Sequence, residues 1–597
     1  MLCGAVLLSF AACGPAEAEQ TPAPPLTTSA TYSYERAVTD ALTYISDYSI
    51  LASMMQTEDN ERFGSVSPSP MWLENKEGTA ADQLLRSDGT YLYILTEGEL
   101  SIFTVDGQNS REISRITVDS VQGMHADQNQ QGERTPVELF VSGGKLAVVF
   151  QSTRSAAGGE NGAVGSSVLS VEIYDVTDPA SPVLDSTFGQ DGVLSGAALE
   201  NGVLYLVSAH EVDAYDQANP DSYVPHTYVN HEARRIPAKN ISVMPTQTAK
   251  RYAVVCAYDL EKEELLSAQA AFGAGNLVCF TQDAVFIAGN TAQQISTASY
   301  EEGEDLVTER VVRPFVQICR YSITDGMLEP GATVTLEGKL KNASLMNCAD
   351  GTLTVATQVE EYIYRETQGG EDDVHVTGEI GPERYANLCV LREDTLKCQT
   401  IAEKLAEGAE LSGIYFGGEW TYLAASGKES SVLAVNAAGG EPQVVSKLQI
   451  TGFPGQLLPW SDSLIFGFGD TPITGNGSGA AGENGLKLVM LDLSNASNPS
   501  IKSVLPLEDS RSAGTYAKNA LFLDAEKNII AFPADGVYDI YSWTDKDGFI
   551  FRHRIETGDW AGPVKSITVG DYSYLLAGET LTVINVRDFI IAGRYTV

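Results

Sequence analysis

The chain has 597 residues, and its 38 Lys and Arg against 79 Asp and Glu give a formal net charge of −41 at pH 7. Such an excess of carboxylates repels nucleic acid phosphates and anionic membrane surfaces, so we expect no nucleic acid partner. Glycine occurs 55 times and cysteine 8 times, a balance that excludes a disulfide scaffold and favours a loop-rich β protein.

The N-terminus predicts export. Leu2 to Ala12 is apolar but too short to span a bilayer, which is typical of the central part of a signal peptide. It ends in Ser9-Phe10-Ala11-Ala12-Cys13-Gly14, which resembles the lipobox of bacterial lipoproteins. The resemblance implies that residues 1–13 are a signal peptide and that Cys13 carries the lipid. An ordinary cleaved signal peptide is the alternative.

Residues 14–32 are rich in Pro, Ala, Thr and Glu, which predicts a disordered tether. In residues 33–57, Ala37, Ala41, Tyr44, Tyr48 and Leu51 recur at three- or four-residue spacing, which predicts an amphipathic helix. A polar linker follows in residues 58–81. No later segment is apolar for eighteen residues, so contact with the membrane is expected only through the lipid anchor.

From Asp82 to Val597 the chain repeats one pattern of short strands and tight turns. Turn dipeptides such as Gly143-Gly144 and Asn201-Gly202 separate strands that are aromatic or β-branched. Four strands per unit, repeated along the chain, predict an all-β fold with a single large β-propeller over residues 82–597. We count nine candidate units and, because propellers have four to eight blades as a rule, prefer eight blades within a range of seven to nine. A row of β-sandwiches and a parallel β-helix are the competing repeat folds.

One hairpin occurs twice in almost the same form. Val171 to Leu184 reads VEIYDVTDPASPVL, and Leu488 to Ile501 reads LVMLDLSNASNPSI. In both, a strand ends in an aspartate and a polar turn leads into a second strand, because Asp, Asn and Ser side chains cap their own backbone. This recurrence supports a repeat architecture.

Five units carry polar insertions between their second and third strands. Insertions that share a strand junction emerge on one face of a repeat protein, where ligands commonly bind. The longest one contains His226, His231 and the basic pair Arg234-Arg235, with His210 at its start. The five are Ala156 to Ser167, Glu211 to Lys250, Thr291 to Arg310, Glu360 to Glu383 and Thr471 to Asn484.

Six cysteines follow the signal region, and most lie in apolar strand runs, where buried free thiols are expected. One pair suggests a disulfide bond. Cys389 and Cys398 are symmetric about Glu393-Asp394, and a two-residue turn there would place them opposite each other, a bond that an exported protein can form. No CxxC spacing occurs, so no structural zinc site is predicted.

No catalytic motif is present, and the six histidines are too scattered for a paired metal site. We therefore expect no cofactor. Acidic turns could hold calcium, but none matches an EF-hand loop and turn formation alone explains them. These turns are Asp175 to Asp178, Glu371 to Asp373 and Asp545 to Gly548.

The chain resembles the secreted β-propeller domain proteins of bacteria and archaea, an uncharacterised family that includes lipoproteins. The resemblance covers about residues 80–597 and rests on the segments ADQLLRSDGTYLYIL, VEIYDVTDPASPV, PDSYVPHTYVN, NALFLDAEKNIIAFP and DYSYLLAGETLTVINVRD. It implies a propeller fold and an extracytoplasmic location, and it implies no activity.

Two functions are compatible with these observations. The first is a monomeric binding or scaffolding module, anchored at the cell surface, for an extracellular protein, peptide or glycan. The second is a propeller hydrolase or lyase that acts on extracellular polysaccharide or peptide. The absence of a motif favours the module without catalytic activity. An enzyme would require ionisable side chains to converge from the first strands of several units.

Overall fold

The computed structural model describes most of the chain from residue 83 onward and two N-terminal segments. The described residues are 26–31, 35–56, 83–96, 98–118, 134–153, 167–212, 216–245, 250–303, 305–368, 374–427, 430–436, 443–450, 455–472, 484–511, 521–534, 536–557 and 564–597. The predicted signal peptide with Cys13, residues 14–25 of the predicted tether and the predicted linker 58–81 lie outside these ranges.

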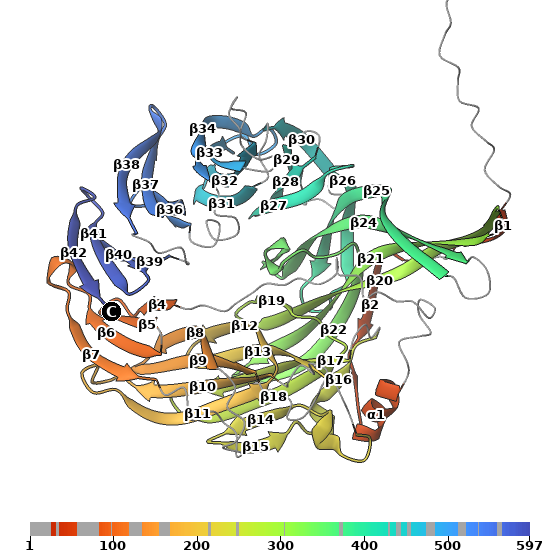
Figure 1. Cartoon of the computed structure of the whole chain (residues 1–597), viewed down its shortest axis with the longest axis horizontal. Helices are drawn as coiled ribbons and strands as arrows, with labels where there is room; N and C mark the ends of the chain where they lie inside the picture. Colours follow the sequence, from red (N-terminus) through yellow and green to blue (C-terminus); the bar gives the residue numbers. More distant parts are fainter. Residues whose placement is uncertain are drawn as a thin grey trace, which may run out of the picture. The chain divides into compact units, whose positions relative to one another are not determined.

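The described residues form an all-β fold, as predicted, with strands that follow one another in sets of four (Figure 1). Blade 1 has β4 (Gln83–Ser87), β5 (Tyr91–Thr96), β6 (Glu99–Thr104) and β7 (Glu112–Thr117). Blade 2 has β8 (Arg134–Ser142), β9 (Lys145–Thr153), β10 (Ser167–Asp175) and β11 (Val183–Asp191). Blade 3 has β12 (Val193–Glu200), β13 (Val203–Glu211), β17 (Arg251–Asp259) and β18 (Glu264–Phe272).

Blades 4 and 5 contain the longest strands of the described chain. Blade 4 has β19 (Leu277–Phe280), β20 (Ala284–Glu302), β21 (Asp305–Thr324) and β22 (Met327–Glu337). Blade 5 has β23 (Met346–Ala349), β24 (Thr352–Gln368), β25 (Val374–Arg392) and β26 (Cys398–Leu405). Because β21 also pairs with β24, these two blades belong to one hydrogen-bonded sheet.

Four regular blades complete the chain. Blade 6 has β27 (Glu410–Gly417), β28 (Trp420–Ser426), β29 (Ser431–Asn436) and β30 (Gln443–Gln449). Blade 7 has β31 (Gly455–Ser461), β32 (Leu464–Pro472), β33 (Asn484–Asp492) and β34 (Ser500–Arg511). Blade 8 has β35 (Phe522–Asp524), β36 (Ile529–Ala534), β37 (Val537–Thr544) and β38 (Gly548–Glu556). Blade 9 has β39 (Lys565–Val569), β40 (Tyr572–Ala577), β41 (Thr580–Asn585) and β42 (Ile591–Thr596).

The number of blades in the described residues is therefore nine, the upper end of the predicted range. The predicted preference was for eight blades. The structure has eight hydrogen-bonded sheets, but one sheet contains both blade 4 and blade 5, so the number of four-stranded blades is larger. The direct count of candidate units in the sequence was the better guide.

Buried hydrophobic clusters join consecutive blades. The series closes because one cluster combines Leu92 and Phe103 of blade 1 with Leu576 and Val583 of blade 9. A four-stranded sheet has two faces to bury, and neighbours on both sides satisfy them without leaving an open end to the series. The first strands also meet between blades, as β4 does with both β8 and β39. This arrangement is a β-propeller.

The middle strands of a blade, such as β5 and β9, do not alternate between apolar and polar residues. In β9, Leu146 to Phe150 are all buried, and in β5 the run from Leu92 to Thr96 is buried as well. Strands covered on both faces need apolar or small residues at every position, so they read as continuous hydrophobic runs. The fourth strands, such as β30, alternate between exposed and half-buried residues instead.

Additional segments cover the outer edges of blades 2, 3 and 4. On blade 2, β14 (His226–Val229) pairs with β11 and carries β15 (Glu232–Arg235). On blade 3, β16 (Ile241–Val243) pairs with β18 and carries β3 (Thr43–Tyr44). On blade 4, β2 (Ala37–Ala41) pairs with β22.

The prediction of a helix over residues 33–57 is therefore wrong for its first half. Only α1 (Tyr48–Gln56) is helical, and β2 and β3 precede it. The spacing of Ala37, Ala41 and Tyr44 suited a helix, but pairing with the open edges of β22 and β16 satisfies the backbone instead. The helix α1 buries Leu51, Ala52 and Met55 among residues of the long insertion. In the described part of the chain, no helix has the length and hydropathy needed to cross a membrane.

A second compact part, which we call the arm, contains Gln294–Val312, Tyr362–Ile380 and the N-terminal strand β1 (Leu26–Thr31). The remaining described residues, from residue 35 onward, form the body. In the arm, β21 pairs with β24 and β1 pairs with β20. The predicted tether 14–32 is thus strand, not disordered chain, over its last described residues.

The predicted position of the insertions is confirmed. All five fall between the second and third strands of their blades, namely blades 2, 3, 4, 5 and 7. Those of blades 4 and 5 are extensions of the strands themselves and form the arm, whereas the long insertion of blade 3 supplies the strands that cover blades 2 and 3.

Candidate functional site

The duplicated hairpin has the same structure in both copies. Asp175 Oδ1 accepts hydrogen bonds from the backbone N–H and hydroxyl of Thr177, and Asp492 Oδ1 accepts the same pair from Ser494. Both turns join the third and fourth strands of their blades. The prediction of a repeated aspartate-capped turn is confirmed.

The same turn occurs a third time, in blade 9. Asn585 Oδ1 accepts from the N–H of Arg587 (2.9 Å), and Asp588 Oδ1 accepts from the N–H of Ile590 (3.1 Å). Asn585 therefore stands where Asp175 and Asp492 stand, and Arg587 takes the place of Thr177 and Ser494. The repeat thus puts an exposed cation at a position that holds a hydroxyl in blades 2 and 7.

A β-bulge near the same end of the blade fixes a second cation. Ile540 pairs with His553 and the next residue, Tyr541, pairs with Phe551, so that Arg552 is the extra residue on β38. A bulge redirects the side chain of its extra residue. Arg552 donates from Nε to Ser542 Oγ at 2.6 Å across to β37.

Bulges at this position recur in other blades, and their charged extra residues differ from Arg552 in having an ion-pair partner. In blade 2 the extra residue is Asp185, which is bound by Lys145, and in blade 7 it is Lys502, which lies 2.8 Å from Asp545. Among the described residues, Arg552 has no carboxylate oxygen within ion-pair distance. A guanidinium that stays charged and has no counter-ion is suited to bind an anion.

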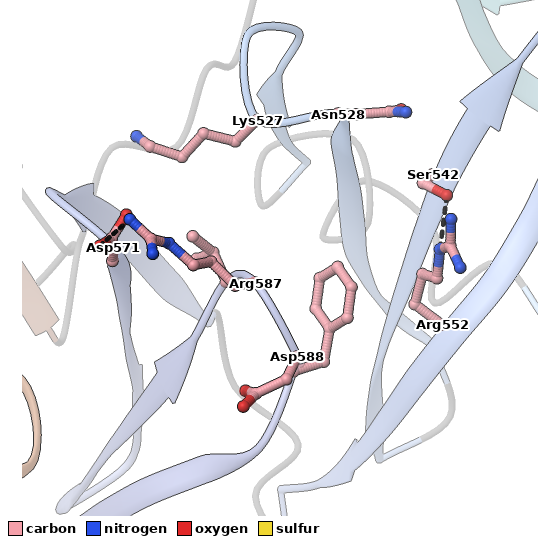
Figure 2. A pocket seen from close by; sticks show the side chains of 9 residues that line it. Lys527, Asn528, Ser542, Arg552, Asp571, Arg587 and Asp588 are labelled. Carbon is pink, nitrogen blue, oxygen red and sulfur yellow. Dashed lines mark hydrogen bonds and ion pairs between the residues drawn. The ribbon is translucent and has the colours of Figure 1, made fainter.

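A pocket of about 720 Å³ lies between blades 8 and 9, in front of these two turns (Figure 2). Figure 2 shows Arg552 with its hydrogen bond to Ser542 on one side and Arg587 with its ion pair to Asp571 on the other. The lining residues are Lys527, Asn528, Ser542, Arg552, Asp571, Val586, Arg587, Asp588 and Phe589.

The side chain of Asn528 ties the β35–β36 turn beside this pocket to the backbone of β37. Its Oδ1 accepts from the backbone N–H of Trp543 (2.8 Å), and its Nδ2 donates to the Trp543 carbonyl (2.9 Å). Because Asn528 has a positive φ of 58°, it ends the β35–β36 turn and leaves Lys527 at the rim. Two bonds to one backbone unit hold the blade 8 side of the pocket rigid.

The charge of the pocket differs from that of the chain. Three cations, Lys527, Arg552 and Arg587, line it against two carboxylates, while the whole chain carries −41. Two of the cations are partnered, since Arg587 lies 2.7 Å from Asp571 and Lys527 lies 3.0 Å from Asp524. Arg552 is therefore the lining cation that is suited to bind a negatively charged group.

A second polar cluster lies at the junction of blades 2 and 3. The buried carboxylate of Asp191 accepts from Tyr228 Oη (2.8 Å) and from the backbone N–H of His226 (2.8 Å), and it lies 3.2 Å from His226 Nδ1. Burial alone would lower the pKa of His226, but its contacts with Asp191 and Asp221 outweigh burial and raise that pKa. Burial alone would raise the pKa of Asp191, but the bonds from His226 and Tyr228 hold it below the usual value. This cluster ties β14 to blade 2.

The long insertion was expected to be a binding loop, and much of it is used in structural contacts. His226 belongs to the cluster just described, and His231 lies in the β14–β15 turn with a φ of 69°. Arg235 Nε lies 2.7 Å from Asp221, and Arg234 lies 3.1 Å from Glu232. The basic pair is therefore partnered within the insertion.

The predicted disulfide bond is not formed, since Cys389 and Cys398 are both free thiols. The turn between them is longer than two residues, because Leu396 adopts a φ of 52° and its N–H donates to the Arg392 carbonyl. Cys389 consequently pairs with Ile401, and Cys398 pairs with Leu391. The remaining predicted site residue, Cys13, lies outside the described residues.

The acidic turns use their carboxylates in local contacts. Asp175 caps its own turn, and Asp545 lies 2.8 Å from Lys502. Within the described ranges, no group of three or more His, Cys, Asp and Glu side chains is arranged to hold a metal ion. Glu371 to Asp373 lie outside those ranges, and calcium binding stays a prediction.

Among the described residues, Arg86 on the first strand β4 and Glu138 on the first strand β8 form an ion pair between neighbouring blades, at 2.5 Å. The two side chains are partly exposed and of opposite charge. They do not form the pair of carboxylates that glycoside hydrolysis uses.

The fold and its closed series of blades define a β-propeller, with a pocket at the junction of blades 8 and 9. The family of the beta propeller domain matches residues 76–579, so the chain belongs to that family. An uncharacterised protein of Archaeoglobus fulgidus is 22% identical over 269 residues, which are 45% of this chain and 36% of that protein. The chain thus matches about a third of the length of this relative.

Solved structures are similar at low identity. A protein of unknown function from Desulfotomaculum acetoxidans is 10% identical, with a TM-score of 0.30, over 57% of this chain and 91% of the other. A protein from Lactobacillus plantarum is 11% identical, with a TM-score of 0.28, over 59% and 94%. A eukaryotic initiation factor is 9% identical, with a TM-score of 0.36, over 88% and 96%.

Sequence reasoning missed Lys527, Arg552 and Arg587. One signal was available, because Arg552-His553-Arg554 is a run of three basic residues in a strongly acidic chain. The bulge that turns Arg552 toward the pocket leaves no mark in the sequence, and the packing of blade 8 beside blade 9 is a tertiary contact.

Proposed function

We propose that the chain is an extracytoplasmic, lipid-anchored binding module whose blade 8–blade 9 pocket captures a carboxylate group of an extracellular peptide, protein or glycan. The observation that carries this proposal is Arg552, which lines a pocket of an acidic protein and has no counter-ion among the residues that the structure describes. Arginine binds a carboxylate through two parallel hydrogen bonds, and such charge-assisted bonds are about twice as strong as neutral ones.

The geometry supports a small anionic group in preference to an extended acidic surface. The net charge of the chain repels a polyanion at long range, whereas screening confines that repulsion to roughly 8 Å at physiological ionic strength. A single carboxylate can therefore reach Arg552 and the rim residue Lys527. The lipid anchor at Cys13 rests on the N-terminal sequence and would hold this pocket at the outer surface of the membrane.

Titration calorimetry with four probes tests the pocket. The probes are an acidic tripeptide, a uronic acid trisaccharide, and the neutral amide or methyl ester of each. We expect one of the two acids to bind and its neutral derivative to bind at least tenfold more weakly. R552Q should weaken binding by about 10- to 100-fold, since it removes a charge-assisted interaction. R594Q is the matched control, because it removes an exposed fourth-strand arginine outside the pocket and should leave the affinity unchanged.

Equal binding of acid and neutral derivative, or equal loss in R552Q and R594Q, would contradict the proposed site. Incubating the same probes with the protein and analysing them for cleavage separates a binding module from the alternative hydrolase or lyase. Anchoring is tested independently by mass spectrometry of the mature N-terminus, with C13A as the variant that should leave the membrane fraction.

A further inference from the structure

The repeated turn between third and fourth strands meets the preceding blade differently at the pocket. In blade 2 the carbonyl of Pro179, the fifth residue counted from the capping aspartate, accepts a hydrogen bond from Ser114 of blade 1 (2.6 Å). In blade 7 the carbonyl of Ala496, at the same position, accepts one from Tyr422 of blade 6 (3.2 Å). In blade 9 this position is Phe589. Its carbonyl accepts no hydrogen bond from the described residues of blade 8, and the pocket lies at this junction instead.

Phe589 has an uncommon backbone conformation for its residue type. Its φ of 60° lies in the left-handed region, which bulky residues rarely adopt. The side chain packs against the hydrophobic cluster of blades 8 and 9 that includes Val586, and it also lines the pocket. Backbone strain of this kind persists where the surrounding structure holds it, and it is concentrated at binding and active sites. The turn of blade 9 thus holds an aromatic ring at the pocket wall, where blades 2 and 7 have Pro and Ala.

Asp588, the residue before the ring, adds a hydrogen-bond acceptor to the pocket. Its Oδ1 accepts from the backbone N–H of Ile590 (3.1 Å) and so completes the turn. Figure 2 shows Asp588 without an ion pair, in contrast to Arg587, which binds Asp571. Within the described ranges no cation lies within ion-pair distance of the Asp588 carboxylate. Its Oδ2 can therefore accept a hydrogen bond from a hydroxyl group of a ligand.

The pocket therefore offers three kinds of contact, namely the guanidinium of Arg552, the ring of Phe589 and the free carboxylate oxygen of Asp588. A uronic acid residue of a polysaccharide matches all three. Its carboxylate pairs with a guanidinium, its hydroxyls donate to a carboxylate, and the C–H groups on one face of its pyranose ring pack on the negative face of an aromatic ring. An Asp or Glu side chain of a peptide supplies the carboxylate alone.

We propose that this pocket is a binding subsite for a uronic acid residue of an extracellular polysaccharide. The inference rests on the proposed function of the same pocket, and it narrows the ligand from any carboxylate to a carboxylated sugar. The volume of about 720 Å³ is within the range of small-ligand sites. A bound sugar connects blades 8 and 9 at the turn position where direct hydrogen bonds connect blades 1 and 2 and blades 6 and 7.

Titration calorimetry of the full chain with three probes tests the ligand class. The probes are a uronic acid trisaccharide, the neutral hexose trisaccharide of the same linkage, and an acidic tripeptide. We expect the uronic acid trisaccharide to bind about tenfold more tightly than either of the others. A tripeptide that binds as tightly or more tightly, with loss of binding in R552Q, would overturn the sugar assignment and leave the carboxylate site standing. Absence of binding by both acids, or equal binding of the neutral trisaccharide, would overturn both proposals.

Substitutions of Phe589 test the contact with the sugar ring. F589G removes the aromatic ring at a φ that glycine adopts readily, and it should weaken binding of the uronic acid trisaccharide about tenfold. F589Y retains the ring and should keep the wild-type affinity. Neither variant should change the affinity for the tripeptide, which has no pyranose ring. Equal affinity of F589G and the wild type for the trisaccharide would overturn the inference.

A substitution of Asp588 should affect the two acids in opposite directions. D588N keeps an oxygen that can cap Ile590 but removes the charge, so it should weaken trisaccharide binding about fivefold and tighten tripeptide binding, since a repelling charge is lost. D178N is the matched control, because Asp178 caps the same turn position in blade 2, with Oδ1 3.1 Å from the N–H of Ala180. It should leave both affinities unchanged. If D588N tightens both acids alike, the ligand is recognised through its carboxylate alone and the sugar assignment is wrong.

Discussion

Blades 2 to 4 and blades 6 to 9 protect the outer edge of their sheets against unwanted strand pairing in different ways. In blades 2 to 4 the outer edge is covered by strands from outside the repeat, and the covered strands β11, β18 and β22 lack Lys and Arg. In blades 6 to 9 no strand of the described chain covers the outer strand, and each of these outer strands carries at least one cation. The difference teaches that the repeat supplies the core of each blade, while edge protection is local and is provided either by cover or by charge.

The segments that cover blades 2 and 3 have a hydrophobic core of their own, which includes helix α1. A substitution in this core should have the largest effect on the free energy of unfolding. Leu51 of α1 is fully buried among residues of the long insertion, including Tyr223, Val224 and Ile236. L51A should lower the free energy of unfolding, measured by urea denaturation, by about 2–5 kcal/mol, because it removes buried methyl groups and leaves a cavity. I50A alters an exposed residue of the same helix turn and should change it by less than about 0.5 kcal/mol. Equal losses would mean that α1 does not anchor the cover.

The His226 cluster makes the cover of blade 2 dependent on pH. The groups that face it are Asp191, Asp221, Tyr228, His210 and Arg235. Since the pKa of His226 is raised above its ordinary 6.5, its contribution is complete below pH 6.5 and is lost as the pH rises through the raised pKa. The lowered pKa of Asp191 means that its own contribution is present above pH 3.8 and is lost as the pH falls through that pKa.

H226Q tests this dependence. The wild type should exceed H226Q in free energy of unfolding by about 1.5–3 kcal/mol between pH 5 and 6.5, since a charge-assisted hydrogen bond is removed. The difference should shrink steadily as the pH rises toward 9. A difference that stays constant over that range would show that His226 is neutral in the folded protein.

In both copies, the repeated turn also accepts one hydrogen bond from the preceding blade. Ser114 Oγ donates to the Pro179 carbonyl (2.6 Å) between blades 1 and 2, and Tyr422 Oη donates to the Ala496 carbonyl (3.2 Å) between blades 6 and 7. S114A and Y422F should each cost about 0.5–1.5 kcal/mol of unfolding free energy in the same urea assay. S446A is the control, because Ser446 Oγ is buried without a hydrogen-bond partner among the described residues. Its removal should be neutral.

The cations of the bare edges should affect association more than folding. K447V removes the charge from β30, where Val444 and Val445 are already exposed. We expect a change of less than about 0.5 kcal/mol in unfolding free energy, together with concentration-dependent light scattering that the wild type lacks. K262V, in the β17–β18 turn of a covered blade, should not scatter. Scattering by both variants would trace the effect to net charge and not to the edge.

Much of the blade pattern could be predicted because it is local. The capped turns at Asp175 and Asp492 and the positions of the insertions follow from turn residues and strand runs that lie next to each other in the chain. The pocket could not be predicted, because it requires the bulge at Arg552 and the neighbouring turn at Arg587 of another blade. The same holds for Cys389 and Cys398, whose offset depends on the left-handed conformation of Leu396.

The sequence by itself determined the strand class, the repeat and its turns, because side-chain alternation and self-capping residues act within a few positions. Only the tertiary structure decided that residues 37–44 form strands. Their three- to four-residue spacing gives a weak preference for helix, and backbone pairing with the open edges of β22 and β16 outweighs it. Tertiary pairing also decided which outer edges of the described blades are covered, because the covering strands come from parts of the chain outside the repeat.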